Sequence, residues 1–128
     1  MSDVVDGGCF CGAVKVSVTL PVATVFHCHC TICRRMHGAP FATWVVVPEA
    51  GLTVSGARLT FASSDQATRE RCASCGAPVL LRTQRAPGRA FVSRGLFADD
   101  APLEAKWHGF WGDRAKWVDV QDGLEKRG

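Results

Sequence analysis

The sequence predicts a mainly β fold in a single domain over residues 1–128, and three observations support this prediction. A chain of 128 residues has the length of one ordinary domain. Short runs that alternate apolar with polar residues, or that are rich in β-branched residues, dominate the sequence. Gly, Pro, Ser and Asp separate these runs, as turn residues do between strands. Hydrophobic residues make up 47% of the chain and charged residues 21%, a balance typical of a folded protein with its own core.

The individual elements follow from local patterns along the chain. The first predicted strand covers 13–20, where three valines alternate with polar residues and indicate a half-buried strand. The only helix expected near a cysteine motif covers 31–37, about two turns, because a glycine and a proline follow it. The apolar, β-branched run at 41–47 predicts a more deeply buried strand that a proline closes. Shorter strands are predicted at 52–55, 58–62, 68–72, 79–83, 90–94 and 106–111.

All seven cysteines have the spacings of metal ligands. They form three clusters, Cys9-x-Cys11, Cys28-x-Cys30-x-x-Cys33 and Cys72-x-x-Cys75. In an extended segment, residues two apart face the same side, so the first pair can reach one ion. An odd number of cysteines argues against a disulfide framework, and three crowded free thiols would be prone to oxidation. Because thiolate-rich sites select zinc over harder metals, we predict bound Zn²⁺.

Counting the thiols divides them between two zinc ions. Cys9, Cys11, Cys72 and Cys75 together make a closed four-thiolate site, which is the structural pattern. The remaining three, Cys28, Cys30 and Cys33, leave a fourth position open, which is the catalytic pattern.

The three nearby histidines leave the state of the second site undecided. His29 should point away from the ion if the cysteines on either side of it point towards it. His27 or His37 could instead occupy the fourth position and close the site. The sequence does not choose between an open site and one closed by imidazole.

The order of the cysteine motifs resembles the glutathione-dependent formaldehyde-activating enzyme family, which includes centromere protein V. The motifs are Gly-Gly-Cys-x-Cys-Gly at 7–12, Cys-His-Cys-x-x-Cys-Arg at 28–34 and Cys-x-x-Cys-Gly at 72–76. Further matches lie at Ser63-Ser64, Arg69, Gly95, 108–117 and 122–124. The resemblance implies an Mss4-like β fold and the same two zinc sites. It also implies carbon–sulfur bond formation or cleavage, which joins glutathione to formaldehyde.

A zinc ion held by three thiolates favours thiol chemistry over hydrolysis. The thiolates quench the charge of the metal, so a bound water should be less acidic than on a neutral three-histidine site. An incoming thiol suits such a site and would lose its proton there. The thiolate could then add to an aldehyde, or be released in the reverse direction. We therefore expect a zinc-dependent carbon–sulfur lyase or thiol–aldehyde adduct synthase, similar to S-(hydroxymethyl)glutathione synthase, with a small thiol such as glutathione and a small aldehyde as partners.

Two side chains are candidates for roles beside the second zinc. Arg34 directly follows the third cysteine cluster and could bind a carboxylate of the thiol substrate. His108 could donate a proton to a developing alkoxide, although a histidine among tryptophans can equally be a packed core residue. The alternative function is a non-catalytic zinc module that binds protein partners, which a histidine-capped zinc would favour.

Charge and hydropathy exclude other classes of function. Four thiolates on one Zn²⁺ carry −2 and three on another carry −1, so the formal charge of +3 falls to zero when both sites are filled. The basicity that would favour nucleic-acid binding then disappears. No run approaches the roughly 18 apolar residues that a membrane span needs. The acidic N-terminal segment lacks the basic and apolar regions of a signal peptide, so we expect a cytoplasmic protein.

Overall fold

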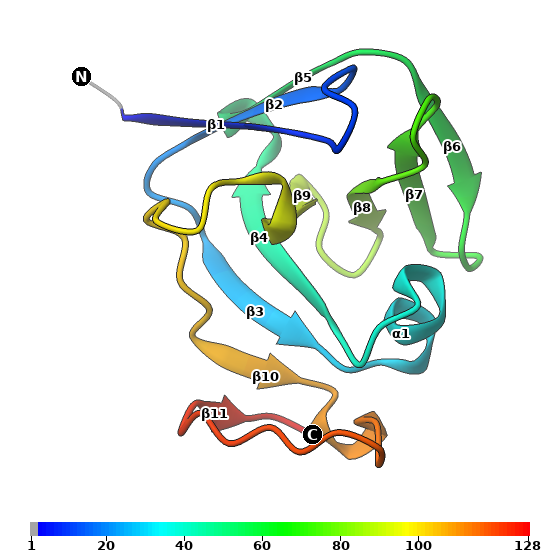
Figure 1. The fold of residues 1–128 in the computed structure, drawn as a ribbon, viewed down its shortest axis with the longest axis vertical. Helices are drawn as coiled ribbons and strands as arrows, with labels where there is room; N and C mark the ends of the chain where they lie inside the picture. Colours follow the sequence, from blue (N-terminus) through cyan, green and yellow to red (C-terminus); the bar gives the residue numbers. More distant parts are fainter. Residues whose placement is uncertain (1–2) are drawn as a thin grey trace.

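The computed structural model describes residues 3–128 and is mainly β, which confirms the predicted fold class (Figure 1). Its strands form one sheet of three and one of eight. In chain order the elements are β1 (Val4–Gly8), β2 (Lys15–Thr19), β3 (Thr24–Cys28), α1 (Thr31–His37), β4 (Ala42–Pro48), β5 (Leu52–Ser55), β6 (Arg58–Ala62), β7 (Ala67–Cys72), β8 (Pro78–Thr83), β9 (Arg89–Ser93), β10 (Trp107–Gly109) and β11 (Glu125–Lys126), with single 3₁₀ turns at Glu49–Gly51, Arg94–Leu96 and Trp111–Asp113. No helix among residues 3–128 has the length and apolar character to cross a membrane.

The small sheet has the order β1-β2-β5, and its three strands lie together at the top of Figure 1. Its central strand β2 pairs antiparallel with both neighbours. Val16 and Val18 of β2, and Val14 just before it, are at most 1% exposed, while Lys15 is exposed. The alternation in the sequence therefore puts one face of this sheet against the rest of the protein.

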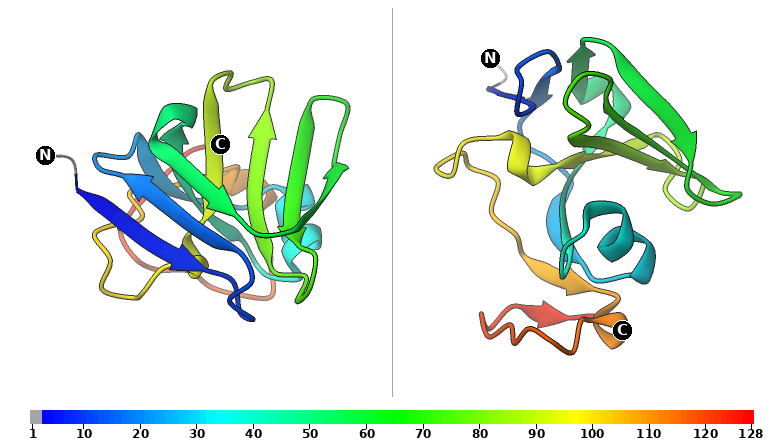
Figure 2. Two further views of the ribbon diagram at one scale, coloured as in Figure 1. Left: turned by 90° about the horizontal axis from the view of Figure 1, so that it is seen from above. Right: turned by 45° about the vertical axis from the view of Figure 1, so that its right-hand side comes forward.

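The large sheet has the order β11-β10-β3-β4-β9-β8-β7-β6 and is buried on both faces at its centre. In β4, Val45 and Val47 belong to the core that packs on the small sheet. Trp44 and Val46 on the opposite face belong to a second core, together with Cys33 of α1. Two buried faces explain why the sequence of β4 is continuously apolar instead of alternating. The second face, the one that carries α1, is where the candidate site lies (Figure 2).

Helix α1 has the bounds that the sequence predicts, and a cysteine begins it. The sulfur of Cys30 accepts a hydrogen bond from the backbone N–H of Cys33 at 3.3 Å and so caps the first turn. Gly38 ends the helix in the left-handed conformation, with φ of 58°, and its N–H donates to the carbonyl of Arg34. The same hydrogen bond also keeps Cys30 and Cys33, two candidate metal ligands, near each other.

Every strand that the sequence predicts is present, with ends shifted by up to two residues, but three further strands were missed. β1 was not predicted because it contains two glycines, which are uncommon in strands. β3 is buried on both sides, so its sequence Thr-Val-Phe-His-Cys shows no alternation. β11 has only two residues and exists because it pairs in parallel with β10.

Candidate metal centres and the adjoining cavity

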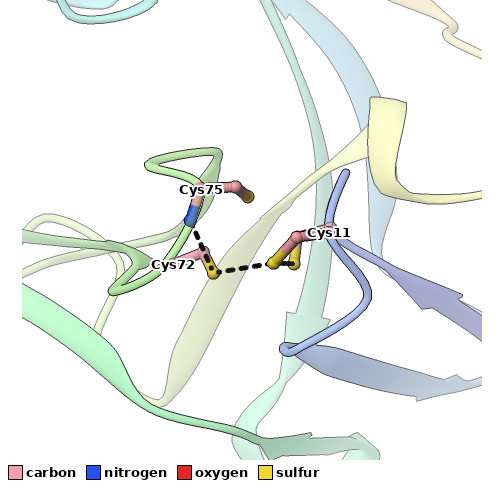
Figure 3. A group of neighbouring side chains, drawn as sticks. Cys11, Cys72 and Cys75 are labelled. Carbon is pink, nitrogen blue, oxygen red and sulfur yellow. Dashed lines mark hydrogen bonds between the residues drawn. The ribbon is translucent and has the colours of Figure 1, made fainter.

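Four of the cysteines meet where the two sheets join. The sulfurs of Cys9, Cys11, Cys72 and Cys75 all lie within 4.8 Å of one another. Cys11 is 3.7 Å from Cys9 and 3.7 Å from Cys72, too far for a disulfide, which needs about 2.05 Å. Figure 3 shows Cys11 reaching from the β1–β2 connection towards Cys72 and Cys75 of the β7–β8 connection. The group therefore links two turns that are about 60 residues apart.

The expectation that Cys9 and Cys11 lie in an extended segment is wrong. Strand β1 ends at Gly8, and the two cysteines lie in the turn that follows it. The N–H of Gly12 donates to the carbonyl of Cys9 at 3.0 Å, and Gly12 has a φ of 81°, which glycine adopts without strain. The turn, and not strand pleating, brings the two sulfurs together.

The second half of the group has a similar local structure. The backbone N–H groups of Ser74 and Cys75 both point at the sulfur of Cys72, at 3.4 Å each. Gly76 closes this turn with a φ of 78°, and its N–H donates to the carbonyl of Cys72. In the first half, the N–H of Val14 points at the sulfur of Cys9 at 3.3 Å. Backbone donors aimed at sulfur favour its thiolate form, the form that binds metal.

The other three cysteines form a separate group on the α1 side of the large sheet. Cys28 ends β3, Cys30 caps α1 and Cys33 lies in its first turn. Their sulfurs all lie within 4.8 Å of one another, and Cys28 and Cys33 are buried. The structure thus gives the same division of the seven thiols as the count from the sequence.

The three thiols cannot all ionise without a cation. Hydrogen bonds from Cys28 and Cys30 lower the pKa of Cys33 to about 2, and the guanidinium of Arg69 adds to this effect. The same contacts raise the pKa of Cys28 far above the ordinary value of a thiol. One thiolate is therefore stabilised in this group, at Cys33, whereas repulsion and burial disfavour ionisation of the other two thiols. A divalent cation would supply the charge needed to hold three thiolates together.

Arg69 is the cation that the structure places beside this group. Its Nη2 donates to the sulfur of Cys33 at 3.3 Å, and its guanidinium lies over the ring of Trp44 at 5.8 Å. Arg69 is only 6% exposed, and its Nε and Nη1 have no hydrogen-bond partner among the described residues. An arginine stays charged when buried, so the sulfur group and any ligand beside it supply the balancing charge.

No histidine of residues 3–128 belongs to the three-thiol group. The ring of His27 bonds the hydroxyl of Thr43 at 2.7 Å through Nδ1, and His37 packs edge-on against Trp44. His29 is 1% exposed and bonds His108 through its Nε2 at 2.8 Å. The fourth position that the sequence left undecided is not filled by imidazole in this arrangement.

The two candidate residues from the sequence do not reach the three-thiol group. His108 is fully buried on the opposite side of the sheet from Cys28, because it pairs with His27 in the parallel register of β10 and β3. Its Nδ1 faces His29 and its Nε2 faces the carboxylate of Asp122 at 2.8 Å. Burial, followed by the charge of His108, lowers the pKa of His29 to about 4, so the ring of His29 is uncharged near neutral pH.

Arg34 lies on the outer side of α1, away from the group. Its Nη1 donates to the backbone carbonyl of Asp113 at 2.8 Å. It borders a shallow hollow near Trp117 and not the cavity beside the thiols. The arginine that borders the cavity and bonds one of the thiols is Arg69. The sequence gave no local signal for it beyond its place in the family resemblance, because residues 68–71 of its strand, Thr-Arg-Glu-Arg, are all polar.

A cavity of about 800 Å³ opens beside the three thiols, within the size range of small-molecule sites. Cys28, Cys30 and Cys33 form part of its wall, and Arg69 faces it from β7. Strands β3, β4, β8, β9 and β10 and the β6–β7 and β8–β9 connections supply most of the remaining wall. The four-thiol group does not border this cavity. Of the two groups, only the second therefore lies on the wall of a cavity of ligand size.

Comparisons with known proteins show which family and which fold this chain is similar to. Residues 4–113 match the family described as Glutathione-dependent formaldehyde-activating enzyme. A Schizosaccharomyces pombe protein named an uncharacterized lyase is 24% identical over 92 residues, which cover 72% of this chain and 67% of that protein. A crystal structure of a Rhodobacter sphaeroides protein superposes with a TM-score of 0.59 at 25% identity, covering 76% of this chain and 91% of that one.

Proposed function

This chain belongs to the glutathione-dependent formaldehyde-activating enzyme family, and we propose that it is a zinc-dependent enzyme that forms or cleaves the carbon–sulfur bond between a thiol and an aldehyde. One observation carries the proposal. Three thiols converge on the wall of a cavity, beside a buried arginine, while the other four form a separate group away from it. Glutathione and formaldehyde are the substrates that the family description suggests, and the reduced state of all seven cysteines suits the cytoplasm.

The four-thiol group supports zinc as the metal. Zinc–sulfur bonds of about 2.3 Å in a tetrahedron separate the sulfurs by about 3.8 Å. The measured separations of 3.7 Å between Cys11 and its two neighbours fit this value. We propose that Cys9, Cys11, Cys72 and Cys75 hold a structural zinc, and that Cys28, Cys30 and Cys33 hold a second one. When bound at the second site, zinc supplies the positive charge that keeps an incoming thiol as its thiolate.

Protein side chains supply the rest of the reaction. The cavity holds the thiol with its sulfur near Cys28, Cys30 and Cys33, and its apolar walls exclude water from the reacting atoms. Arg69 is placed to stabilise the oxygen of the aldehyde as it gains negative charge, because its Nη1 and Nε have no other partner. This role replaces the ones that the sequence suggested for His108 and Arg34.

The reaction needs no oxidant or reductant. In the forward direction, a sulfur–carbon bond forms, the carbon–oxygen double bond becomes a single bond, and the proton lost by the thiol ends on the new hydroxyl. In the reverse direction, the same carbon–sulfur bond breaks and returns a thiol and an aldehyde. This is nucleophilic addition of a thiolate, which forms because the site lowers the pKa of the bound thiol.

Cobalt-substituted protein tests the proposal. Glutathione should change the sulfur-to-cobalt charge-transfer bands of the second site, and formaldehyde should then change them again as the adduct forms. Carbon-13 exchange spectroscopy of labelled formaldehyde with glutathione should show faster exchange with the zinc protein than with the Cys30→Ser variant. If no thiol alters the cobalt spectrum and exchange is not accelerated, the enzyme proposal fails, and a non-catalytic zinc module that binds protein partners becomes the better explanation.

A further inference from the structure

The wall of the cavity next to the three thiols is mainly aromatic and aliphatic. The rings of Phe26 and Trp107 are stacked, with centroids 4.3 Å apart and planes 7° from parallel. Phe91 meets Phe26 edge-on at 6.0 Å and Trp44 edge-on at 6.4 Å. These four rings come from β3, β4, β9 and β10, which are neighbours in the sheet. They form a continuous aromatic surface, whose face and edges suit another aromatic or aliphatic group.

Some polar groups along this wall have partners, while the indole N–H of Trp44 and the Nε and Nη1 of Arg69 have none among the described residues. The hydroxyl of Thr24 accepts a hydrogen bond from the indole N–H of Trp107 at 3.0 Å. The hydroxyl of Thr83 accepts one from the backbone N–H of Arg85 at 3.2 Å. The stacked faces of Phe26 and Trp107 offer no further donor, so they are the part of the wall that suits an apolar group.

A strained residue adds a further aromatic ring to the cavity. Phe110 has a φ of 55°, the only non-glycine residue among residues 3–128 in the left-handed region. Such a conformation costs about 1–2 kcal/mol for a residue with a side chain, and glycine avoids it. Phe110 borders the cavity and is 44% exposed, so core packing does not account for the bulky side chain at this position.

We propose that the substrate of the second site is a thiol, or its aldehyde adduct, that carries a bulky apolar group of about the size of an aromatic ring. The inference rests on the proposed function and names its substrate class. The sulfur would sit at Cys28, Cys30 and Cys33, and the apolar group would lie along the Phe26–Trp107 stack. Gln66, Arg85 and Arg89 line the outer part of the cavity and are exposed, so a polar tail of the substrate can remain in water there.

Three thiols of different character test this substrate class in the cobalt-substituted protein. We expect 2-phenylethanethiol to bind at least tenfold more tightly than 2-mercaptoethanol, because burial of a phenyl group contributes about 2 kcal/mol. Glutathione should bind more weakly than 2-phenylethanethiol. The readout is the thiol concentration that half-completes the change in the charge-transfer bands.

Two substitutions locate the preference in the cavity. Ala67→Leu adds bulk on the cavity side of β7, so it should weaken binding of 2-phenylethanethiol at least tenfold and leave 2-mercaptoethanol within about twofold. Thr68→Leu is the matched control, because residue 68 does not line this cavity and is exposed on the same strand. Phe110→Gly removes an aromatic wall and also relieves backbone strain, so it should lower affinity for 2-phenylethanethiol while the melting temperature stays equal or rises.

The outcomes distinguish a failure of the proposed substrate class from a failure of the proposed function. If glutathione binds as tightly as 2-phenylethanethiol, or if Ala67→Leu weakens all three thiols equally, the apolar substrate class is wrong while thiol binding stands. If none of the three thiols changes the cobalt spectrum, the proposed function itself fails, and the substrate class fails with it.

Discussion

At the scale of single residues, Arg69 has the most unusual environment among the residues of the site. It combines near-complete burial, one hydrogen bond to a ligand candidate, Cys33, and two donor atoms without partners among the described residues. A buried cation is costly unless opposite charge lies beside it. Three thiolates with one Zn²⁺ carry a net −1, which matches the +1 of Arg69. The arginine and the filled metal site therefore stabilise each other.

Arg69→Met should weaken metal binding at the second site. The substitution keeps most of the side-chain length but removes the charge and the donor to Cys33. Loss of a partner that hydrogen-bonds a metal ligand typically lowers metal affinity 10- to 100-fold. Competition with a chelator, followed by cobalt absorbance, measures this affinity. The control is Arg71→Met on the same strand, since Arg71 is exposed and lies over Phe61. Equal affinities in the two variants would show that Arg69 does not support the metal.

Substitution of one cysteine from each group should give different losses. Cys72→Ser removes a ligand from the group that joins the two sheets, so the melting temperature should fall by about 10 °C or more. Cys30→Ser should leave a folded protein that binds one zinc fewer and melts much closer to the wild type. Differential scanning calorimetry and metal analysis measure the two effects. Equal melting temperatures would contradict the division into a structural and an open site.

At the scale of elements, the buried histidines attach the C-terminal segment to the large sheet. Asp122 accepts from the imidazole of His108 at 2.8 Å and from the backbone N–H of Leu124 at 3.1 Å. His108 in turn meets His29, which precedes the Cys30 cap of α1. β11 then pairs with β10 over only two residues. This chain of contacts, and not strand pairing alone, holds the last residues in place.

Asp122→Asn should loosen this segment while leaving the metal sites filled. The hydrogen bond from Leu124, followed by that from His108, lowers the pKa of Asp122. The ionised carboxylate of Asp122 therefore stabilises the folded protein at pH values above the ordinary carboxyl pKa. This stabilisation is lost as the pH falls through the lower pKa that Asp122 has in the folded state. At pH 7.5 the substitution should cost about 1–2 kcal/mol and speed amide exchange in 107–109 and 125–126. Asp119→Asn, whose carboxylate meets only the exposed Gln121, is the control. Unchanged exchange rates would rule out the attachment.

At the scale of the whole molecule, the two cysteine groups lie on different surfaces of the large sheet. The four-thiol group joins the β1–β2 turn to the β7–β8 turn and so ties the small sheet to the large one (Figure 3). The three-thiol group and the cavity lie on the other face of the sheet, the face that carries α1 (α1 is seen in Figures 1 and 2). The proposed structural site is therefore separated from the cavity.

Protein purified without chelator should contain about two equivalents of zinc. Both groups offer thiol sets that select zinc, and neither group depends on the other for its ligands. Because the second site has three protein ligands instead of four, treatment with a mild chelator should remove its zinc first, leaving about one equivalent and a folded protein. Elemental analysis and circular dichroism follow the two steps. Removal of both ions together, with loss of structure, would contradict the independence of the two sites.

The sequence by itself determined the mainly β class, the helix at 31–37 and the division of the seven thiols into four and three. The helix and the cysteine turns depend on contacts within a few residues, such as the cap formed by Cys30 or the turn closed by Gly76, so local spacing is enough to predict them. The division of the thiols followed from counting them against the four ligands of a closed zinc site, although its two pairs are about 60 residues apart. Only the tertiary structure decided that Arg69, and not Arg34 or His108, lies beside the second group. A shift of one residue in the pairing of a strand moves each of its side chains to the opposite face of the sheet. That pairing is set by strands from distant parts of the chain. The aromatic cavity has the same origin, because its walls come from strands that meet only in the folded sheet.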